Sequence, residues 1–485
     1  MPNRCLDLSL WLTVAIAAYA SINAGPHVAA AAQRPNFVFI LADDLGWGDL
    51  GCYGHPHIKT PNLDRLARRG TLFTQFYVNA SVCSPSRCAF FTGQYPARHR
   101  IHGHYASRQQ NESRGMSNWL PADVPNVAQL LHGAGYATAH IGKWHLGSRS
   151  GGPSIEKYGF DFVGTSERNG ANGPPDDPYF RARSTEIFVD EALDFVEKHK
   201  AEPFYLQLWT LIPHATLNPT ESQMARYRRF RAGGKNFPHA SAAQIFYATV
   251  TDLDTQIGRL INRLDELGLA DNTLILFSSD NGPEDIHVRN AGHSGIGSAG
   301  PFRGRKRSLY EGGVRVPGIV CWPGHVPSGK IDDKSVVAGA DWLPTVCRLA
   351  GIDVPDGHQL DGVDAGDILL GKSNTRGKPL HWQWRFRVAG EPFHRSPILS
   401  IRDGDWKLLF NPDRSRVELY DIPRDPTEMN NLAEQQPQVV ERLAGQALAW
   451  QSQLPDGPMQ PQAGSNDYPW PKPDSNAAPA KPAGK

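Results

Sequence analysis

Two pairs of oxygen-bearing side chains follow apolar runs in this sequence. Asp43 and Asp44 come directly after one run, and Asp280 and Asn281 come directly after another. Carboxylate and amide oxygens are the ligands that Ca²⁺ and Mg²⁺ take, whereas Zn²⁺ prefers sulfur and nitrogen. A single aspartate at a strand end is more often a turn former or helix cap. Two such pairs, each after a buried strand, predict a metal site.

A second candidate is Cys83, which begins the run Cys83-Ser-Pro-Ser-Arg87. Proline suits the first turn of a helix, so we expect a helix that starts near Cys83 and continues through Thr92. Backbone N–H groups at that end favour anions, and Arg87 would lie on the same side one turn later. The string fits a helix start with an ordinary buried thiol equally well, and by itself it leaves both interpretations open.

Lysine and histidine side chains follow two further apolar runs. Lys143 and His145 come after one of them, and His214 after the other. In open α/β sheets, ligands bind beyond the carboxyl ends of the strands. Four run ends that supply acids, an amide, a lysine and histidines therefore predict one composite site. His145, which follows Trp144, is also compatible with a packed core histidine.

The segments that would position these residues alternate between short apolar runs and helix-like stretches. We expect buried strands at residues 36–42, 136–141, 204–211 and 273–279, and helices at residues 185–199 and 242–267. In the last of these, apolar residues recur at helical spacing from Ile245 to Leu264. This alternation predicts an α/β fold with a large, mostly parallel sheet flanked by helices.

The pattern changes after about residue 376. Short strands at residues 399–410 and 417–421, a turn at 411–414 and a helix at 438–454 predict a small C-terminal antiparallel sheet plus helix. The last stretch is rich in proline and alanine, which is typical of a disordered tail. The expected organisation is a targeting segment at 1–32, a main domain at 33–375, a small subdomain at 376–454 and a tail at 455–485.

Composition and the N-terminus limit the classes of partner. The 485 residues carry a net charge of +1 and are 40% hydrophobic, so neither nucleic acid nor an anionic membrane is an expected partner. Arg4, an apolar run from Leu8 to Ile22 and small residues up to Ala32 follow the order of a secretory signal. The run is shorter than the roughly 18–20 residues of a spanning helix. We expect a secreted or periplasmic protein without stable membrane insertion; an uncleaved anchor is the alternative.

The cysteines allow disulfides without requiring them. Cys5 would leave with the signal, and four cysteines other than Cys83 remain, which allows three pairings. An oxidising compartment permits bridges. The sequence does not choose between bridges and free buried thiols.

The chemistry-bearing runs resemble the motifs of the type I sulfatase family, in that family's order. The matching runs are Leu41-Ala-Asp-Asp-Leu-Gly-Trp-Gly-Asp-Leu-Gly51, Cys83-Ser-Pro-Ser-Arg87 with Thr92-Gly93, Gly142-Lys-Trp-His-Leu-Gly147, Ser279-Asp-Asn-Gly282 and Gly304-Arg-Lys-Arg-Ser-Leu-Tyr-Glu-Gly-Gly313. The resemblance extends from about Asn36 to near Asp421 and is strongest to the arylsulfatase and N-acetylgalactosamine-6-sulfatase-like branch. It implies an alkaline-phosphatase-like catalytic domain at 33–375 that hydrolyses sulfate esters.

The resemblance also implies a role for each residue. The metal ligands would be Asp43, Asp44, Asp280 and Asn281, for Ca²⁺ or alternatively Mg²⁺. Cys83 would be oxidised to formylglycine by a formylglycine-generating enzyme. The remaining roles are Arg87 holding the formylglycine hydrate, Lys143 and Lys306 clamping sulfate oxygens, His145 acting as base and His214 protonating the leaving alcohol. Without the family string, Lys306 among its arginine neighbours would more often be part of a solvated basic loop.

The chemistry of sulfate transfer explains these residue types. A serine that attacked sulfur would end as a stable sulfate ester. A hydrated aldehyde has two hydroxyls: one attacks sulfur, and loss of the proton from the other expels sulfate and restores the aldehyde. Cationic donors in a water-poor pocket stabilise the transferring group by about 2.7–4 kcal/mol each in oxyanion-type sites. A general acid adds roughly 10²–10⁴-fold.

Four further residues are candidates for substrate binding, namely His104, His293, Trp384 and Arg385, and for each the alternative is turn formation or core packing. Secretion and nearby aromatic residues favour a sulfated carbohydrate as substrate. A phosphonate or phosphate ester hydrolase of the same superfamily is the nearest alternative function. A non-catalytic binder of sulfated glycans is the alternative of another class.

Overall fold

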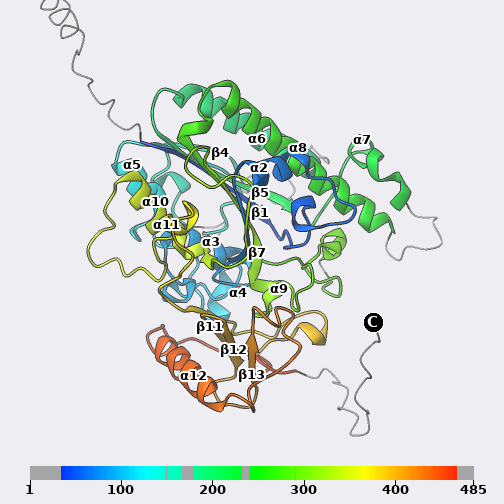
Figure 1. Ribbon diagram of the computed structural model, residues 1–485, viewed down its shortest axis with the longest axis vertical. Helices are drawn as coiled ribbons and strands as arrows, with labels where there is room; N and C mark the ends of the chain where they lie inside the picture. Colours follow the sequence, from blue (N-terminus) through cyan, green and yellow to red (C-terminus); the bar gives the residue numbers. More distant parts are fainter. Residues whose placement is uncertain (1–33, 148–150, 167–179, 232–239, 290, 467–485) are drawn as a thin grey trace, which may run out of the picture. The chain divides into compact units, whose positions relative to one another are not determined.

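The computed structural model describes residues 34–147, 151–166, 180–231, 240–289 and 291–466. These residues form the expected α/β fold, with a large, mostly parallel sheet flanked by helices and a small antiparallel sheet near the C-terminus (Figure 1). The predicted targeting segment at 1–32 and the end of the predicted tail, 467–485, lie outside the described residues. Among the described helices, none has the length and apolar character needed to cross a membrane.

The large sheet contains all four strands predicted from the sequence. In the described residues its order is β4-β3-β5-β1-β6-β7-β2-β8, with β9 paired to β2. β7 runs antiparallel to β6 and β2, and the other neighbours are parallel. The strands are β1 (Asn36–Asp43), β2 (Thr71–Tyr77), β3 (Ala137–Gly142), β4 (Phe162–Ser166), β5 (Phe204–Pro213), β6 (Thr273–Ser279), β7 (Arg315–Cys321), β8 (Lys330–Asp332) and β9 (Val337–Ala338).

The central strand β1 shows why a continuous apolar run belongs in the middle of the sheet. All of its residues are buried. Phe37 and Phe39 pack into one core, whereas Val38 and Ile40 pack into a second core. Successive side chains of a strand point to opposite faces. A strand that is apolar at every position must therefore be covered on both faces, as parallel strands are.

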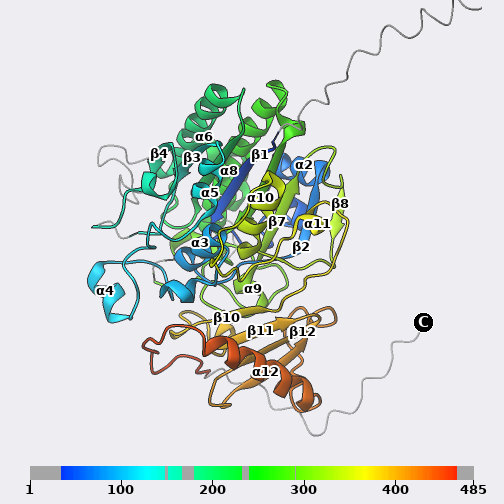
Figure 2. The ribbon, with the colours of Figure 1, turned by 90° about the vertical axis from the view of Figure 1, so that its left-hand side faces the viewer.

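Helices cover both faces of the large sheet (Figure 2). Residues of α2, α6 and α8 pack into one core, and residues of α3, α5, α10 and α11 pack into the other. The helices predicted at 185–199 and 242–267 correspond to α6 and α8. The helices are α2 (Pro61–Arg69), α3 (Cys83–Thr92), α4 (Arg108–Ser113), α5 (Val127–Gly133), α6 (Phe180–His199), α7 (Glu221–Met224), α8 (Ala240–Glu266), α9 (Glu311–Val314), α10 (Trp342–Ala350), α11 (Gly366–Leu369) and α12 (Pro437–Gln451).

The small sheet confirms the predicted antiparallel subdomain with one correction. Its order is β10 (Leu380–Gln383), β11 (Leu399–Asp403), β12 (Trp406–Phe410) and β13 (Val417–Asp421). The segment predicted as one strand at 399–410 is two strands, because the chain turns at Gly404, whose φ is 60°. Glycine takes this left-handed conformation at little cost. The predicted C-terminal helix is α12, which packs on this sheet through a separate apolar core.

A buried ionic cluster ties the small sheet to the large one. Lys407 of β12 places Nζ 2.8 Å from Oε1 of Glu311 and 3.0 Å from Oε1 of Glu428, and all three side chains are fully buried. Burial raises the pKa of Glu428 to about 7. Burial acts the same way on Glu311, but Lys407 and neighbouring arginines hold its pKa at about 2. Glu311 begins α9, so the cluster anchors the end of the segment that carries Lys306.

Residues 455–466, which the sequence assigned to the tail, pack against the segment that follows β10. The backbone N–H of Gln460 donates to the carbonyl of Arg385 at 2.9 Å, and its side-chain Oε1 accepts from the N–H of Arg387 at 2.6 Å. Backbone groups of a neighbouring segment thus order a stretch whose composition alone predicts disorder.

The structure answers the question about cysteine pairing for the described residues. Cys52, Cys83, Cys88, Cys321 and Cys347 are all free thiols, and all except Cys52 are buried. Buried thiols in apolar surroundings are unreactive. The protein therefore depends on packing and ionic contacts rather than on disulfides within this part of the chain.

Candidate active site

The predicted site residues meet at one edge of the large sheet. Strands β3, β5, β1 and β6 are adjacent and mutually parallel, so their carboxyl ends lie side by side. These ends carry Lys143 and His145 after β3, His214 after β5, Asp43 and Asp44 at β1, and Asp280 and Asn281 after β6. This arrangement agrees with the single composite site predicted from the residues that follow the four apolar runs.

Three carboxylates and one thiol form a compact cluster at this edge. One potential ligand atom from each of Asp43, Asp44, Cys83 and Asp280 lies within 4.8 Å of all the others, and all four residues are buried. Asn281 donates from Nδ2 to Oδ1 of Asp44 at 2.8 Å, while its own buried Oδ1 has no hydrogen-bond partner among the described residues. A buried oxygen without a partner is costly, and a cation would satisfy it. The donor set fits Ca²⁺ or Mg²⁺.

Two buried lysines pair with the carboxylates of β1. Nζ of Lys143 lies 2.9 and 2.7 Å from the two carboxylate oxygens of Asp43. Nζ of Lys306 lies 2.6 and 2.7 Å from those of Asp44. Burial alone would raise the pKa of Asp43, but Lys143 and other nearby cations lower it well below its usual range. Both pairs are therefore ionic at neutral pH.

Helix α3 brings Cys83 and Arg87 into the cluster, as the sequence predicted. Cys83 is its first residue, and Val82 before it supplies no side-chain cap. Pro85 has no N–H and that of Ser86 donates to the carbonyl of Val82, so the N–H groups that can face an anion are those of Cys83 and Ser84. Nε and Nη2 of Arg87 donate to Oδ2 of Asp280 at 3.1 and 2.7 Å, and Nη1 donates to the carbonyl of Lys143 at 2.8 Å. Arg87 thus joins the helix to the ends of β3 and β6.

The thiol of Cys83 is not a nucleophile in this environment. Burial raises the pKa of Cys83 to about 12. The thiolate, and not the thiol, is the reactive form of cysteine. At neutral pH the unmodified side chain is protonated, even though it lies among groups suited to catalysis.

The two predicted catalytic histidines are held by backbone carbonyls. Nε2 of His145 donates to the carbonyl of Tyr105 at 3.2 Å. Nδ1 of His214 donates to the carbonyl of Ala215 at 2.6 Å, and its Nε2 lies 3.8 Å from Oδ2 of Asp44. Burial lowers the pKa of both histidines. His214 retains 36% exposure of its side chain, so it is open to a ligand.

Several site residues adopt backbone conformations that the sequence could not predict. Asp44, His145 and Arg307 have φ values of 66°, 53° and 77°. Such left-handed conformations are strained for residues other than glycine, and they concentrate at functional sites. At Asp44 the conformation lets the backbone N–H donate to Oδ1 of Asp280 at 3.1 Å.

A cleft of about 470 Å³ has predicted substrate residues in its wall. His104 and Trp384 both line it, together with Arg307. Nη2 of Arg307 donates to Oε2 of Glu284 at 2.9 Å, and that carboxylate lies 3.8 Å from Nζ of Lys306. The wall of the cleft is thus continuous with the carboxylate and lysine cluster.

The other two predicted substrate residues lie elsewhere. Arg385 is buried and donates to Oε1 of Gln383 at 2.8 Å and to the carbonyl of Pro455 at 3.1 Å. His293 lies in the 3₁₀ helix η7 (Gly292–Ile296). Neither belongs to the described residues that line the cleft, and a substrate-binding role for either one stays a prediction.

Sequence reasoning missed three contributors to this region. Glu284 and Arg307 were available as neighbours of Asp280 and Lys306 in the chain, and this proximity was the only signal for them. The contact from the N–H of Tyr105 to Oγ of Ser84, at 3.0 Å, gave no signal. It holds the segment behind His104 against the start of α3.

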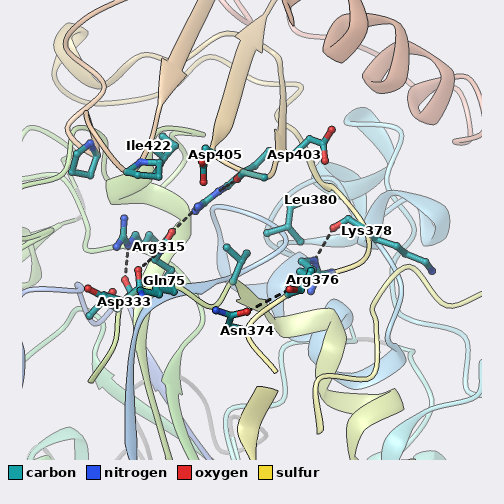
Figure 3. A pocket seen from close by; sticks show the side chains of 18 of the residues that line it. Gln75, Arg315, Asp333, Asn374, Arg376, Lys378, Leu380, Asp403, Asp405 and Ile422 are labelled. Carbon is teal, nitrogen blue, oxygen red and sulfur yellow. Dashed lines mark hydrogen bonds between the residues drawn. The ribbon is translucent and has the colours of Figure 1, made fainter. Parts of the chain in front are cut away.

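A larger hollow of about 610 Å³ lies where the small sheet meets the edge of the large sheet (Figure 3). Arg315, Arg376 and Asp403 are among the side chains around it. It contains none of the predicted site residues. Volume by itself therefore does not locate the candidate active site, whereas the clustered carboxylates and cations do.

Comparison with known proteins agrees with this geometry. A model of the sulfatase family matches residues 35–352, and a model described as N-sulphoglucosamine sulphohydrolase, C-terminal, matches residues 300–453. The chain is 34% identical to N-acetylgalactosamine-6-sulfatase of Sus scrofa over 381 residues, covering 72% of this chain and 68% of that protein. It is 33% identical to arylsulfatase A of Bos taurus over 483 residues, covering 88% of each.

A solved structure supports the same assignment. The crystal structure of Ps i-CgsB in complex with k-i-k-neocarrahexaose superimposes with a TM-score of 0.70 at 26% identity, covering 86% of this chain and 93% of that chain. The expected alkaline-phosphatase-like fold and the expected resemblance to the arylsulfatase and N-acetylgalactosamine-6-sulfatase branch are confirmed. The chain belongs to the sulfatase family and is a sulfuric ester hydrolase.

Proposed function

We propose that this enzyme hydrolyses sulfate esters of a sulfated carbohydrate, using a formylglycine made from Cys83 and a bound calcium ion. The observation that carries the proposal is the position of Cys83, at the uncapped start of α3 and within 4.8 Å of three buried carboxylates. Relatives named for N-acetylgalactosamine-6-sulfate and a neighbour bound to neocarrahexaose support a carbohydrate substrate. Removal of residues 1–32, a secreted or periplasmic location and maturation by a formylglycine-generating enzyme belong to the same proposal.

The carboxylate cluster would hold the cation. Asp43, Asp44, Asp280 and Asn281 are its ligands in this proposal, with Mg²⁺ as the alternative ion. Three carboxylates face three cationic side chains in the cluster, so a divalent ion leaves an excess of positive charge for an anionic substrate. When bound there, the ion would supply Lewis-acid stabilisation of the sulfate group.

Oxidation of Cys83 would replace a thiol that is protonated at neutral pH with a side chain that can act as a nucleophile. As a hydrated aldehyde, residue 83 would supply one hydroxyl to attack sulfur and a second whose deprotonation would release sulfate and restore the aldehyde. Arg87 positions this residue through its bonds to Asp280 and the backbone of Lys143. The N–H groups at the start of α3 favour the negative charge that develops there.

The remaining side chains bind the sulfate and move protons. Lys143 and Lys306 stabilise charge on the sulfate oxygens, because both ammonium groups are buried and held at fixed carboxylates. His145 is neutral at pH 7 and, since Nε2 donates to the carbonyl of Tyr105, it presents Nδ1 as a base. His214 lies across the site with Nε2 near Asp44, where it can protonate the leaving alcohol.

Replacing His214 by glutamine tests its role as proton donor. We expect kcat for a sugar sulfate, whose alcohol is a poor leaving group, to fall by about 10²–10⁴-fold. We expect a much smaller loss with an aryl sulfate whose phenol is acidic, because that group leaves without a proton. The half-exposed His132, which pairs with Asp161 at 3.0 Å, provides the matched control H132Q. Equal losses on both substrates would rule out proton donation by His214.

Matched aryl esters distinguish the proposed function from its nearest alternative. The enzyme, produced in cells that modify Cys83, should turn over an aryl sulfate with a higher kcat/KM than the corresponding aryl phosphate or phosphonate. The reason is that the chain belongs to the sulfatase family, and because the matched esters share one leaving group, the ratio reports which transferring group the site favours. Preference for the phosphorus esters would identify a phosphonate or phosphate ester hydrolase, and binding without turnover of any ester would identify a glycan binder.

A further inference from the structure

We propose that the cleft beside the catalytic cluster binds a second anionic group of the substrate. The preferred substrates would then carry the sulfate that is cleaved and, on the leaving sugar, a further sulfate or carboxylate. This inference deepens the proposed function and rests on it, because it concerns the alcohol side of the same site.

The first observation is an imbalance of charge in the cleft. Its described lining includes Arg114, Arg307 and Arg387 and contains no aspartate or glutamate. Arg307 is neutralised by Glu284, whose Oε2 accepts from it at 2.9 Å. Among the ion pairs of the described residues, none involves Arg114 or Arg387. Within the part of the chain that the structure describes, two positive charges in the wall therefore lack an anionic partner.

Acidic residues near the cleft in sequence are engaged elsewhere. Glu112, two positions before Arg114, pairs with Nε of Arg108 at 3.0 Å and accepts from Asn118 at 3.1 Å. Oε2 of Glu391 lies 3.7 Å from Nε2 of His287, and Asp456 acts electrostatically on Arg385. These contacts leave the positive field of the cleft in place.

Arg114 shows the energetic consequence of this imbalance. It is partly buried, and burial lowers its pKa, with no carboxylate of the described segments acting against this effect. Nη1 donates to the carbonyl of His104 at 3.4 Å, and the guanidinium lies 5.9 Å from the ring centre of Phe386. A cation held away from water without a counter-ion is costly. An anionic ligand would offset that cost and would accept hydrogen bonds from the guanidinium.

His104 lies in the same wall, and nearby positive charges affect its pKa. Burial, followed by the charges of Lys306 and Arg114, lowers its pKa to about 3. His104 is therefore neutral and can donate or accept a hydrogen bond. The influence of Lys306 on it also shows that the cleft and the sulfate-binding lysine are close in space.

The lining of the cleft also contains groups suited to a sugar. Trp384 is buried, and its indole N–H has no hydrogen-bond partner among the described residues. Phe386 and Met459 add apolar surface. Residues 458–461 close this side, and the bond from the N–H of Arg387 to Oε1 of Gln460, at 2.6 Å, holds them there.

The cleft is joined to the catalytic cluster through two short paths. Tyr105, next to His104, donates its N–H to Oγ of Ser84 at 3.0 Å and accepts from His145 at 3.2 Å. The second path is the contact of Arg307 with the carboxylate that faces Lys306. A substrate with its reacting sulfate at Lys306 would extend its alcohol portion into this cleft, whose volume of about 470 Å³ is in the usual range for small-ligand pockets.

The test uses three disaccharides that share one cleavable sulfate. One has no other charge, the second carries another sulfate on the leaving sugar, and the third carries a carboxylate there. The unsubstituted enzyme is expected to favour the doubly charged substrates through a lower KM with similar kcat. R114Q and R387Q should each reduce that preference by about tenfold, the scale of one charge-assisted hydrogen bond, while R114K and R387K retain part of it. Arg424, whose side chain is 87% exposed on the small subdomain, gives the control R424Q, which should keep the full preference.

A binding measurement separates failure of this inference from failure of the proposed function. Calorimetry with the C83A variant reports the affinity for each disaccharide without turnover. The proposal is supported if C83A binds the doubly charged disaccharides more tightly and if R114Q and R387Q abolish this difference in affinity. That conclusion holds even if the enzyme hydrolyses none of the disaccharides. Equal affinity for all three overturns it, whatever the turnover. Whichever doubly charged disaccharide binds more tightly identifies sulfate or carboxylate as the group recognised. High salt should weaken the preference.

Discussion

Replacing Cys83 by alanine should lower kcat on sulfate esters by on the order of 10⁶-fold, the loss seen when a hydrolase loses its nucleophile. The fold should persist, because the side chain removed is small and its thiol makes no hydrogen bond that the structure records. Thermal unfolding of the variant should remain cooperative. Turnover at the original rate, or loss of cooperative unfolding, would favour the ordinary buried thiol.

Cys88 provides the matched control for this experiment. It lies in the same helix, is equally buried and packs in the apolar core with its Sγ 3.9 Å from Oγ1 of Thr92. C88A should lose some stability and keep its activity. C83S should behave differently from both, because a serine that attacks sulfur is trapped as a sulfate ester after one turnover. Mass analysis of the peptide would detect that ester.

The peptide that contains residue 83, taken from unsubstituted protein made in its own cells, tests directly whether Cys83 is converted to formylglycine. Mass analysis should show conversion of the Cys83 thiol to an aldehyde. This result is expected because the hydrate of an aldehyde has a second hydroxyl through which sulfate can be released, whereas a thiol has none. Active enzyme with an intact thiol would contradict the proposal.

Removing the divalent ion should have an effect of similar size. Chelation should reduce sulfatase activity to background and lower the unfolding temperature, and Ca²⁺ should restore both. The structural reason is that Asp43, Asp44 and Asp280 lie buried within one cluster and the buried Oδ1 of Asn281 has no partner among the described residues. At a ligand concentration about 100–1,000 times its Kd, the expected gain in stability is about 2.7–4.1 kcal/mol.

Two variants make the metal experiment specific. N281L removes a proposed ligand but leaves the lysine–aspartate pairs, so it should need more Ca²⁺ for the same activity. D265N changes an aspartate that pairs with Arg69 at the surface, and it should respond to chelator as the unsubstituted enzyme does. A parallel titration with Mg²⁺ tells the two ions apart. Full activity in chelator, with no metal found by elemental analysis, would contradict the site.

The sequence by itself determined those features that depend on neighbouring residues. The apolar run from Asn36 is β1, the proline-containing run from Cys83 is α3, and the residues after the predicted strands are at strand ends. Periodicity and local turn chemistry specify such elements because side-chain direction repeats along a strand or helix. The same reasoning did not locate the turn at Gly404, and residues 455–466 make contacts with a distant segment that the local pattern does not encode.

Only the tertiary structure decided how these elements combine into a site. The strand order β3-β5-β1-β6 differs from chain order, and it sets Lys143 against Asp43. The tertiary fold as a whole sets Lys306, which precedes α9, against Asp44. It also places Arg114 and Arg387 in the wall of one cleft, although the chain separates them widely. Contacts between distant segments depend on which faces pack together, and no local pattern encodes that choice. The residue types therefore indicated the chemistry, whereas the cluster of arginines in the cleft was visible only in the folded chain.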